Sequence, residues 1–128
     1  MGFAARRTGP PEAHRGGPRR RRGERCPERL NGIFAFAIWD EVRETLFCAR
    51  DRLGVKPLVY AERGSAFIFG SELKAILAHP AVRSELDSEG LSEVFVMGPA
   101  RTPGHGVFHS VYELRPGHWL LHSRSWRW

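Results

Sequence analysis

Cysteine is scarce in this 128-residue chain, and long apolar runs are absent. Two cysteines, Cys26 and Cys48, are too few for the disulfide framework of a small secreted domain. No apolar stretch approaches the roughly 20 residues that a membrane-spanning helix needs, and no signal-peptide core follows the N-terminus. We therefore expect a protein of the reducing cytoplasm that has no membrane segment.

Lysine is absent from residues 1–29, although this segment is strongly basic. Its nine arginines and three glutamates give a formal charge of 9 − 3 = +6, which equals the net charge of the whole chain. The rest of the chain is therefore neutral, which argues against a nucleic-acid-binding domain. Large apolar side chains are nearly missing from residues 1–29, so burial cannot offset the entropy of ordering, and we expect disorder.

Three interpretations of residues 1–29 are open. A basic tail would bind nucleic acid or another acidic surface through Arg19–Arg22. A transit peptide would be amphipathic and rich in serine, and this segment is neither. The third interpretation is a start translated in a wrong reading frame, because GC-rich codons read out of frame give such mixtures of Arg, Gly, Pro and Ala.

Four short apolar runs between Leu30 and Ala75 predict four strands. They are Ile33–Trp39, Leu46–Ala49, Pro57–Tyr60 and Ala66–Phe69. Apolar residues occupy consecutive positions in each run, so these strands should be covered on both faces. The connections are too short for the crossover that parallel pairing requires, so neighbouring strands should pair antiparallel.

Two helices and two further strands complete the expected elements. Ser71 is a candidate N-cap for a helix over residues 72–77, and Asp87 for one that runs to Met97. Short strands are expected at residues 107–111 and 119–122, around a tight turn. In the loop over residues 50–56, Gly54 is the residue expected to take a positive φ.

Four motifs occur in order along the chain, and each carries a recognisable pattern. They are the LNGIFAFAIWD run (residues 30–40), the ARDRLGVKPLVY run (49–60), the SELKAILAHP run (71–80) and the LRPGH turn (114–118). Together they resemble the glutaminase domain of glutamine-dependent asparagine synthases over about residues 28–128. Val59 departs from this pattern, because the family usually has the first of two tyrosines there.

The resemblance implies an α+β fold, the N-terminal-nucleophile type of class II glutamine amidotransferases. In that fold two antiparallel sheets pack face to face with helices outside (αββα), and residues 30–128 would form only its C-terminal part, so the sandwich would be incomplete. The implied partners are glutamine and a synthetase domain that follows the glutaminase domain. ATP and magnesium would bind in that synthetase domain, so no cofactor is expected in this chain.

The resemblance transfers no catalytic residue to this chain. The family uses an N-terminal cysteine thiolate with its own free α-amine as base, whereas position 2 here is Gly. The family's other substrate-binding motifs lie upstream of the LNG run, and nothing in residues 1–29 matches them. Cys26 follows Arg25 within the chain and has no free α-amine, so we do not expect it to replace the missing nucleophile.

The expected function is therefore that of an inactive fragment of an asparagine synthase. The alternative is a non-enzymatic binding module whose Arg-rich tail contacts nucleic acid, which we favour less. A sheet without its first strands should also leave an open edge.

Arg50, Arg52 and Lys56 could form an anion or interface site, because arginine pairs readily with anions. We favour a structural interpretation, in which Asp51 and its neighbours form an ion-pair and turn network between two strands.

Four histidines, His105, His109, His118 and His122, lie close together in the sequence. A zinc site needs three or four converging ligands, and neither Cys nor an acidic residue stands at ligand spacing, so we expect no metal site. The aromatic side chains could instead form a base-stacking platform, but they lie in wholly apolar runs and are expected in the core. They are Phe34, Phe36, Trp39, Phe67 and Phe69.

Overall fold

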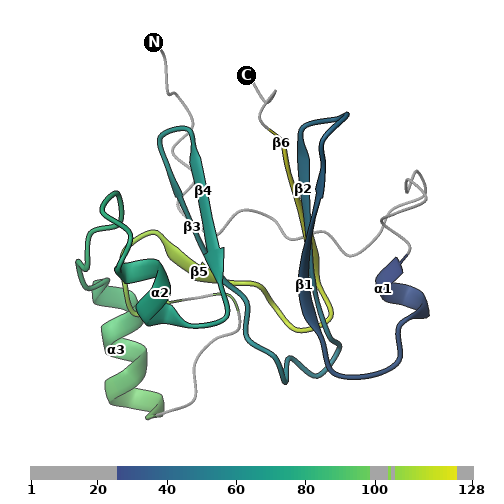
Figure 1. The fold of residues 1–128 in the computed structure, drawn as a ribbon. Helices are drawn as coiled ribbons and strands as arrows, with labels where there is room; N and C mark the ends of the chain where they lie inside the picture. The colour runs from purple at the N-terminus through teal and green to yellow at the C-terminus, as the bar shows by residue number, and fades with distance from the viewer. Residues whose placement is uncertain (1–25, 99–103, 105, 124–128) are drawn as a thin grey trace.

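The computed structural model describes residues 26–98, 104 and 106–123 (Figure 1). The described residues form two three-stranded antiparallel sheets and three short helices. The first sheet has the order β1 (Ala35–Asp40), β2 (Thr45–Arg50), β6 (Trp119–Ser123). The second has the order β4 (Ala66–Gly70), β3 (Val59–Arg63), β5 (Val111–Glu113). The helices are α1 (Cys26–Arg29), α2 (Leu73–Leu77) and α3 (Ser88–Met97).

The two sheets pack against each other through one face of each. Ala37 lies opposite Cys48 in the register of β1 and β2, and Tyr60 lies opposite Phe69 in that of β3 and β4. Alternate residues along these strands point into a shared core that both sheets supply. Its buried members are Leu46, Cys48, Leu58, Tyr60 and Leu114, with Ala35, Ala37, Phe67, Tyr112 and Leu120 packed around them.

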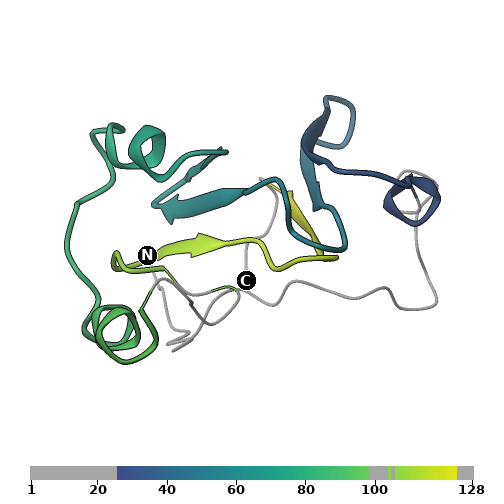
Figure 2. The ribbon, with the colours of Figure 1, turned by 90° about the horizontal axis from the view of Figure 1, so that it is seen from below.

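A second apolar cluster covers the other face of the second sheet. It joins Ala61 of β3 and Val111 of β5 to Ile76 of α2 and to Val82. Figure 2 shows α2 and α3 on the side of the second sheet and α1 on the side of the first. The described residues therefore form a small α+β sandwich of two antiparallel sheets, as the family resemblance implies.

The expected burial on both faces is right for β2 and wrong for β1. All residues of β2 after Thr45 are buried, whereas Ile38 and Trp39 of β1 are 51% and 52% exposed. Phe69 of β4 is also exposed. Within the described part of the chain, each of these strands lies at the edge of its sheet, where a side chain has neighbouring strands on one side only. The expected core positions of Trp39 and Phe69 are therefore wrong.

Several element boundaries also differ from the sequence-based expectation. Residues 107–110 make a turn with an isolated bridge between Leu86 and Phe108, so β5 begins only at Val111. The N-cap of α2 is Glu72 rather than Ser71, and its side chain makes no capping hydrogen bond. Cys26–Arg29 are helical rather than disordered, while residues 1–25 lie outside the described part.

Two other local expectations, the N-cap at Asp87 and the positive φ of Gly54, are confirmed. Asp87 caps α3, and its Oδ1 accepts hydrogen bonds from the backbone N–H of Glu89 (2.9 Å) and Gly90 (3.5 Å). Gly54 has a φ of +66°. Among the described residues, no helix is both long and apolar enough to cross a membrane.

Candidate functional site

Arg50 ends β2, where the chain passes from the first sheet to the second. Its side chain is buried, and it donates hydrogen bonds to the carbonyl oxygens of Lys56 (2.7 Å), Leu114 (2.6 Å) and Gly54 (2.7 Å). Its Nη1 also lies 2.8 Å from Oε1 of Glu113. All three guanidinium nitrogens already have hydrogen-bond partners within the chain, so the Arg50 side chain is not available to bind an external anion.

Asp51 follows Arg50 and is 1% exposed. Its Oδ1 accepts from the backbone N–H of Leu53 (3.0 Å) and Val55 (3.1 Å), and its Oδ2 accepts from Lys56 (3.1 Å). Burial acts to raise the pKa of the Asp51 carboxyl, but these N–H donors outweigh it and hold the pKa below its ordinary value. The carboxylate is thus ionised at neutral pH and fixes the following loop.

The backbone of Asp51 extends this network to the connection between β5 and β6. Its carbonyl accepts from the backbone N–H of Gly117 (2.7 Å), and its own N–H donates to Phe34 O (2.8 Å). The loop packs closely here, because a Cβ on Gly54 would lie 2.6 Å from Cγ of Pro116. These contacts tie together three chain segments that are distant in sequence.

The geometry supports the structural interpretation of the Arg50–Arg52 stretch, with one difference. Arg50 pairs with Glu113 rather than with neighbouring Asp51. Arg52 and Lys56 are the members of this set that face solvent. The sequence did not predict Glu113 as the partner of Arg50. Glu113 directly precedes the LRPGH turn, but no spacing rule relates it to Arg50.

Cys48 does not have the surroundings of a catalytic nucleophile. Cys48 is fully buried between the sheets, and this burial raises the pKa of its thiol to about 12. Cys26 is partly exposed at the start of α1.

Of the four histidines considered as metal ligands, the three that the structure describes have different surroundings. Nδ1 of His118 lies 2.8 Å from the carbonyl oxygen of Pro116. His122 stacks on Phe67 with ring centroids 4.5 Å apart, and its Nδ1 lies 3.6 Å from Oε1 of Glu62. His109 is exposed, and His105 lies outside the described residues. Within the described part of the chain, no group of three or more His, Cys, Asp or Glu side chains could hold a metal ion.

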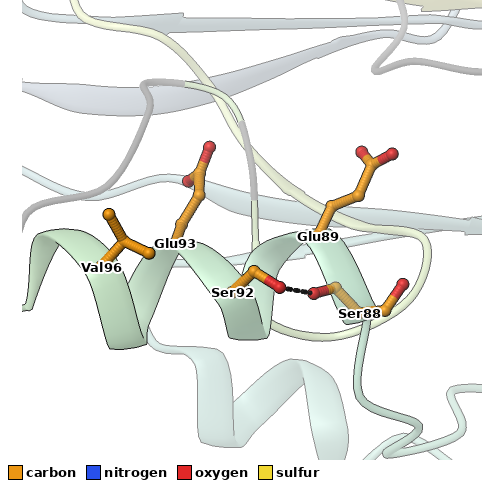
Figure 3. Close-up of a pocket in the computed structure, with 5 residues that line it drawn as sticks. All are labelled: Ser88, Glu89, Ser92, Glu93 and Val96. Atoms are coloured by element: carbon orange, nitrogen blue, oxygen red, sulfur yellow. Dashed lines mark hydrogen bonds between the residues drawn. The ribbon is translucent and has the colours of Figure 1, made fainter.

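A hollow on the surface of α3 is the remaining candidate site (Figure 3). Its lining comes from one helix: Ser88, Glu89, Ser92, Glu93 and Val96. The Ser92 hydroxyl donates to the carbonyl oxygen of Ser88 (2.8 Å), one turn earlier. A single helix cannot surround a ligand, and no nucleophile and base meet here, so this hollow indicates no chemistry.

Residues 19–126 match a family described as the glutamine amidotransferase domain. This match begins within the basic N-terminal segment, upstream of the first strand.

Three relatives illustrate the similarity. The chain is 57% identical over 109 residues to asparagine synthetase 3 (glutamine-hydrolyzing) of Bacillus subtilis. The aligned region covers 82% of this chain and 18% of that protein. It is 36% identical over 91 residues to a putative asparagine synthetase 2 (glutamine-hydrolyzing) of Methanocaldococcus jannaschii, covering 70% and 18% respectively. The amidase chry2 of Gibberella zeae is 36% identical over 97 residues, covering 72% and 13%. The chain thus spans less than a fifth of the length of each relative.

Proposed function

This chain belongs to the glutamine amidotransferase domain family, and we propose that it is the C-terminal part of the glutaminase domain of a glutamine-dependent asparagine synthase. The similarity to the Bacillus subtilis asparagine synthetase 3 carries this proposal, because its identity is the highest of the three relatives compared. The two packed antiparallel sheets, with α2 and α3 beside the second sheet and the short α1 on the side of the first, are compatible with the N-terminal-nucleophile type of sandwich.

In the proposed parent enzyme, the glutaminase domain hydrolyses glutamine and a second domain uses the released ammonia. ATP and magnesium bind in that second domain, where aspartate is activated and amidated. The described residues contribute the frame of the glutaminase domain: Arg50 and Asp51 fix the loop that joins the two sheets. The amidase chry2 is similar over 97 residues of this chain, so this segment occurs in proteins with names other than asparagine synthetase.

We further propose that the 128-residue chain hydrolyses no glutamine by itself. The reaction needs a thiolate next to a base, so that the thiolate attacks the amide carbon and the base delivers a proton to the leaving ammonia. Cys48 is buried and protonated at neutral pH. Cys26 lies within the chain and carries no free α-amine.

Ammonia release from glutamine tests this proposal. The purified 128-residue chain should release none above the buffer background, while a full-length asparagine synthetase assayed in parallel should. Turnover by the chain that disappears in Cys26→Ala would identify Cys26 as a nucleophile and overturn the proposed inactivity.

The DNA upstream of the coding region tests the proposed parentage separately. We expect a shifted reading frame that encodes a Met-Cys start followed by the first half of the glutaminase domain. Upstream DNA that encodes no such start in any frame would contradict the proposed parentage. The alternative function, nucleic-acid binding by residues 1–29, predicts retention on DNA or RNA that falls steeply with salt.

A further inference from the structure

Strand β1 forms one edge of the first sheet among the described residues. The sheet order is β1-β2-β6, so β1 pairs on one side with β2 and its other side carries no described strand. Ile38 and Trp39, on opposite faces of β1, are each about half exposed. An edge strand of this kind can accept a further strand.

The hydrogen-bond pattern shows which backbone groups of β1 face outward. The N–H of Asp51 donates to Phe34 O (2.8 Å), so the polar groups of residue 34 point toward the β2 side. Register is continuous from Ala35 to Asp40, and antiparallel pairing alternates residue by residue. Phe36 and Ile38 therefore also point toward β2. The N–H and C=O groups of Ala35, Ala37 and Trp39 point away from the sheet.

The sequence and register of β1 carry none of the residues or bulges that protect natural sheet edges. Its sequence, AFAIWD, contains no lysine and no proline, and its register has no bulge. The single charged residue is Asp40 at its end, and its carboxylate is paired with Arg43 at 2.6 Å. Five consecutive residues of this edge are thus uncharged.

We propose that β1 pairs antiparallel with β1 of a second copy of this chain, with the two-fold axis at Ala37. The outward groups of residues 35, 37 and 39 are symmetric about this position, so the edge is complementary to itself. Ala35 would lie opposite Trp39 of the second copy, which places a small side chain against the half-exposed indole. Phe36 would lie opposite Ile38 of the second copy, which makes an apolar pair on the other face.

The pairing joins two three-stranded sheets into one continuous sheet of six strands. Its contact consists of one short strand from each copy, which is at the small end of protein interfaces. We therefore expect a reversible dimer that dissociates on dilution. The dimer is expected of the isolated chain, whether or not the chain has the proposed function.

Residue-resolved amide exchange, combined with sedimentation equilibrium, tests the pairing in the full 128-residue chain. With rising concentration a dimer should form, and the amides of Ala35, Ala37 and Trp39 should become protected together. The amides of Phe36 and Ile38 should be protected at every concentration, because β2 binds them. A chain that stays monomeric, or a dimer with exchanging outward amides, would overturn the proposal. Protection of those amides in the monomer would show instead that another segment of the same chain covers the edge.

Two variants and one matched control make the test specific. Ala37→Pro removes the outward N–H at the axis, and Ile38→Lys places two like charges on one face near the axis. Both should abolish the dimer. Val42→Lys makes the same kind of exchange at a 93% exposed position in the hairpin turn, and should leave the dimer intact. Protection of the β2 amides shows that each variant is folded, and a dimer that persists in folded Ile38→Lys would contradict the proposal.

Discussion

Two turns in this molecule use the same pair of residue types in opposite surroundings. In the hairpin between β1 and β2, Nη1 of Arg43 lies 2.6 Å from Oδ2 of Asp40, and the two side chains are 60% and 33% exposed. In the connection between β2 and β3, Arg50 and Asp51 are both buried. The members of the first pair bind each other. In the second turn, Arg50 binds backbone carbonyls that include one of a distant segment, Leu114, and Asp51 binds backbone N–H groups of the loop that follows it. The Asp40–Arg43 pair is therefore a local surface contact, whereas Arg50 and Asp51 form a structural joint between chain segments.

The two aspartates show the same difference in their titration. The pKa of Asp40 is lowered chiefly by the hydrogen bond from the Arg43 side chain. The pKa of Asp51 is lowered although burial opposes ionisation, because three backbone N–H groups donate to its carboxylate. A hydrogen bond to a surface ion pair competes with water, whereas a buried donor has no water to replace a lost acceptor.

The largest difference is expected between Arg50→Met and Arg43→Met. Loss of the buried guanidinium leaves three carbonyl groups and the Glu113 carboxylate without their partner, and should lower the free energy of unfolding by about 3–5 kcal/mol. Arg43→Met removes an exposed pair and should cost about 0–1 kcal/mol. Urea unfolding of the two variants measures both values. Equal losses would show that burial does not distinguish the two turns.

A smaller difference is expected between two glycines that both have positive φ. Gly54 (φ +66°) lies against Pro116, while a Cβ on Gly64 (φ +59°), in the turn between β3 and β4, would meet nothing within 4 Å. Gly54→Ala adds a steric clash to the backbone strain and should cost about 2–4 kcal/mol. Gly64→Ala should cost about 1 kcal/mol from strain alone. Thermal unfolding of the two alanine variants provides the comparison.

The smallest effect is confined to acid pH. Both aspartates have lowered pKa values in the folded chain, so the unfolded chain binds more protons in the window between the folded and unfolded values. Their stabilisation is therefore complete above the unfolded pKa, about 4, and is lost as the pH falls through the folded pKa. Asp51→Asn should flatten the fall in unfolding free energy below about pH 4 more than Asp40→Asn does. Equal slopes of unfolding free energy against pH for the two variants, measured by urea unfolding, would contradict the expected difference between the two aspartates.

Local signals in the sequence were sufficient for much of the fold. Consecutive apolar runs and short connections predicted the antiparallel strands, and Asp87 and Gly54 were identified because capping and positive φ depend on the residue itself. The boundaries of β5 could not be predicted, since Phe108 leaves the strand pattern to form a bridge with Leu86. That bridge depends on how a distant segment packs.

The candidate site shows the same division. The turn network around Asp51 follows from its neighbours in the chain, and its local hydrogen bonds were expected. The pairing of Arg50 with Glu113 joins residues from two different sheets, and no periodicity in the sequence relates them. The exposure of Trp39 also escaped prediction, because an apolar run does not reveal which strand forms the edge of a sheet.

The joint at Asp51 has a mechanical consequence. The chain passes between the sheets twice at this end, after β2 and before β6, and the Gly117–Asp51 hydrogen bond links the two passages (Figure 1). The two sheets are therefore held together most firmly at the end where these two connections lie. Thermal motion should change the distance between the sheets least beside Asp51 and Gly117. The distance should vary most at the opposite end, where His122 of one sheet meets Phe67 and Glu62 of the other.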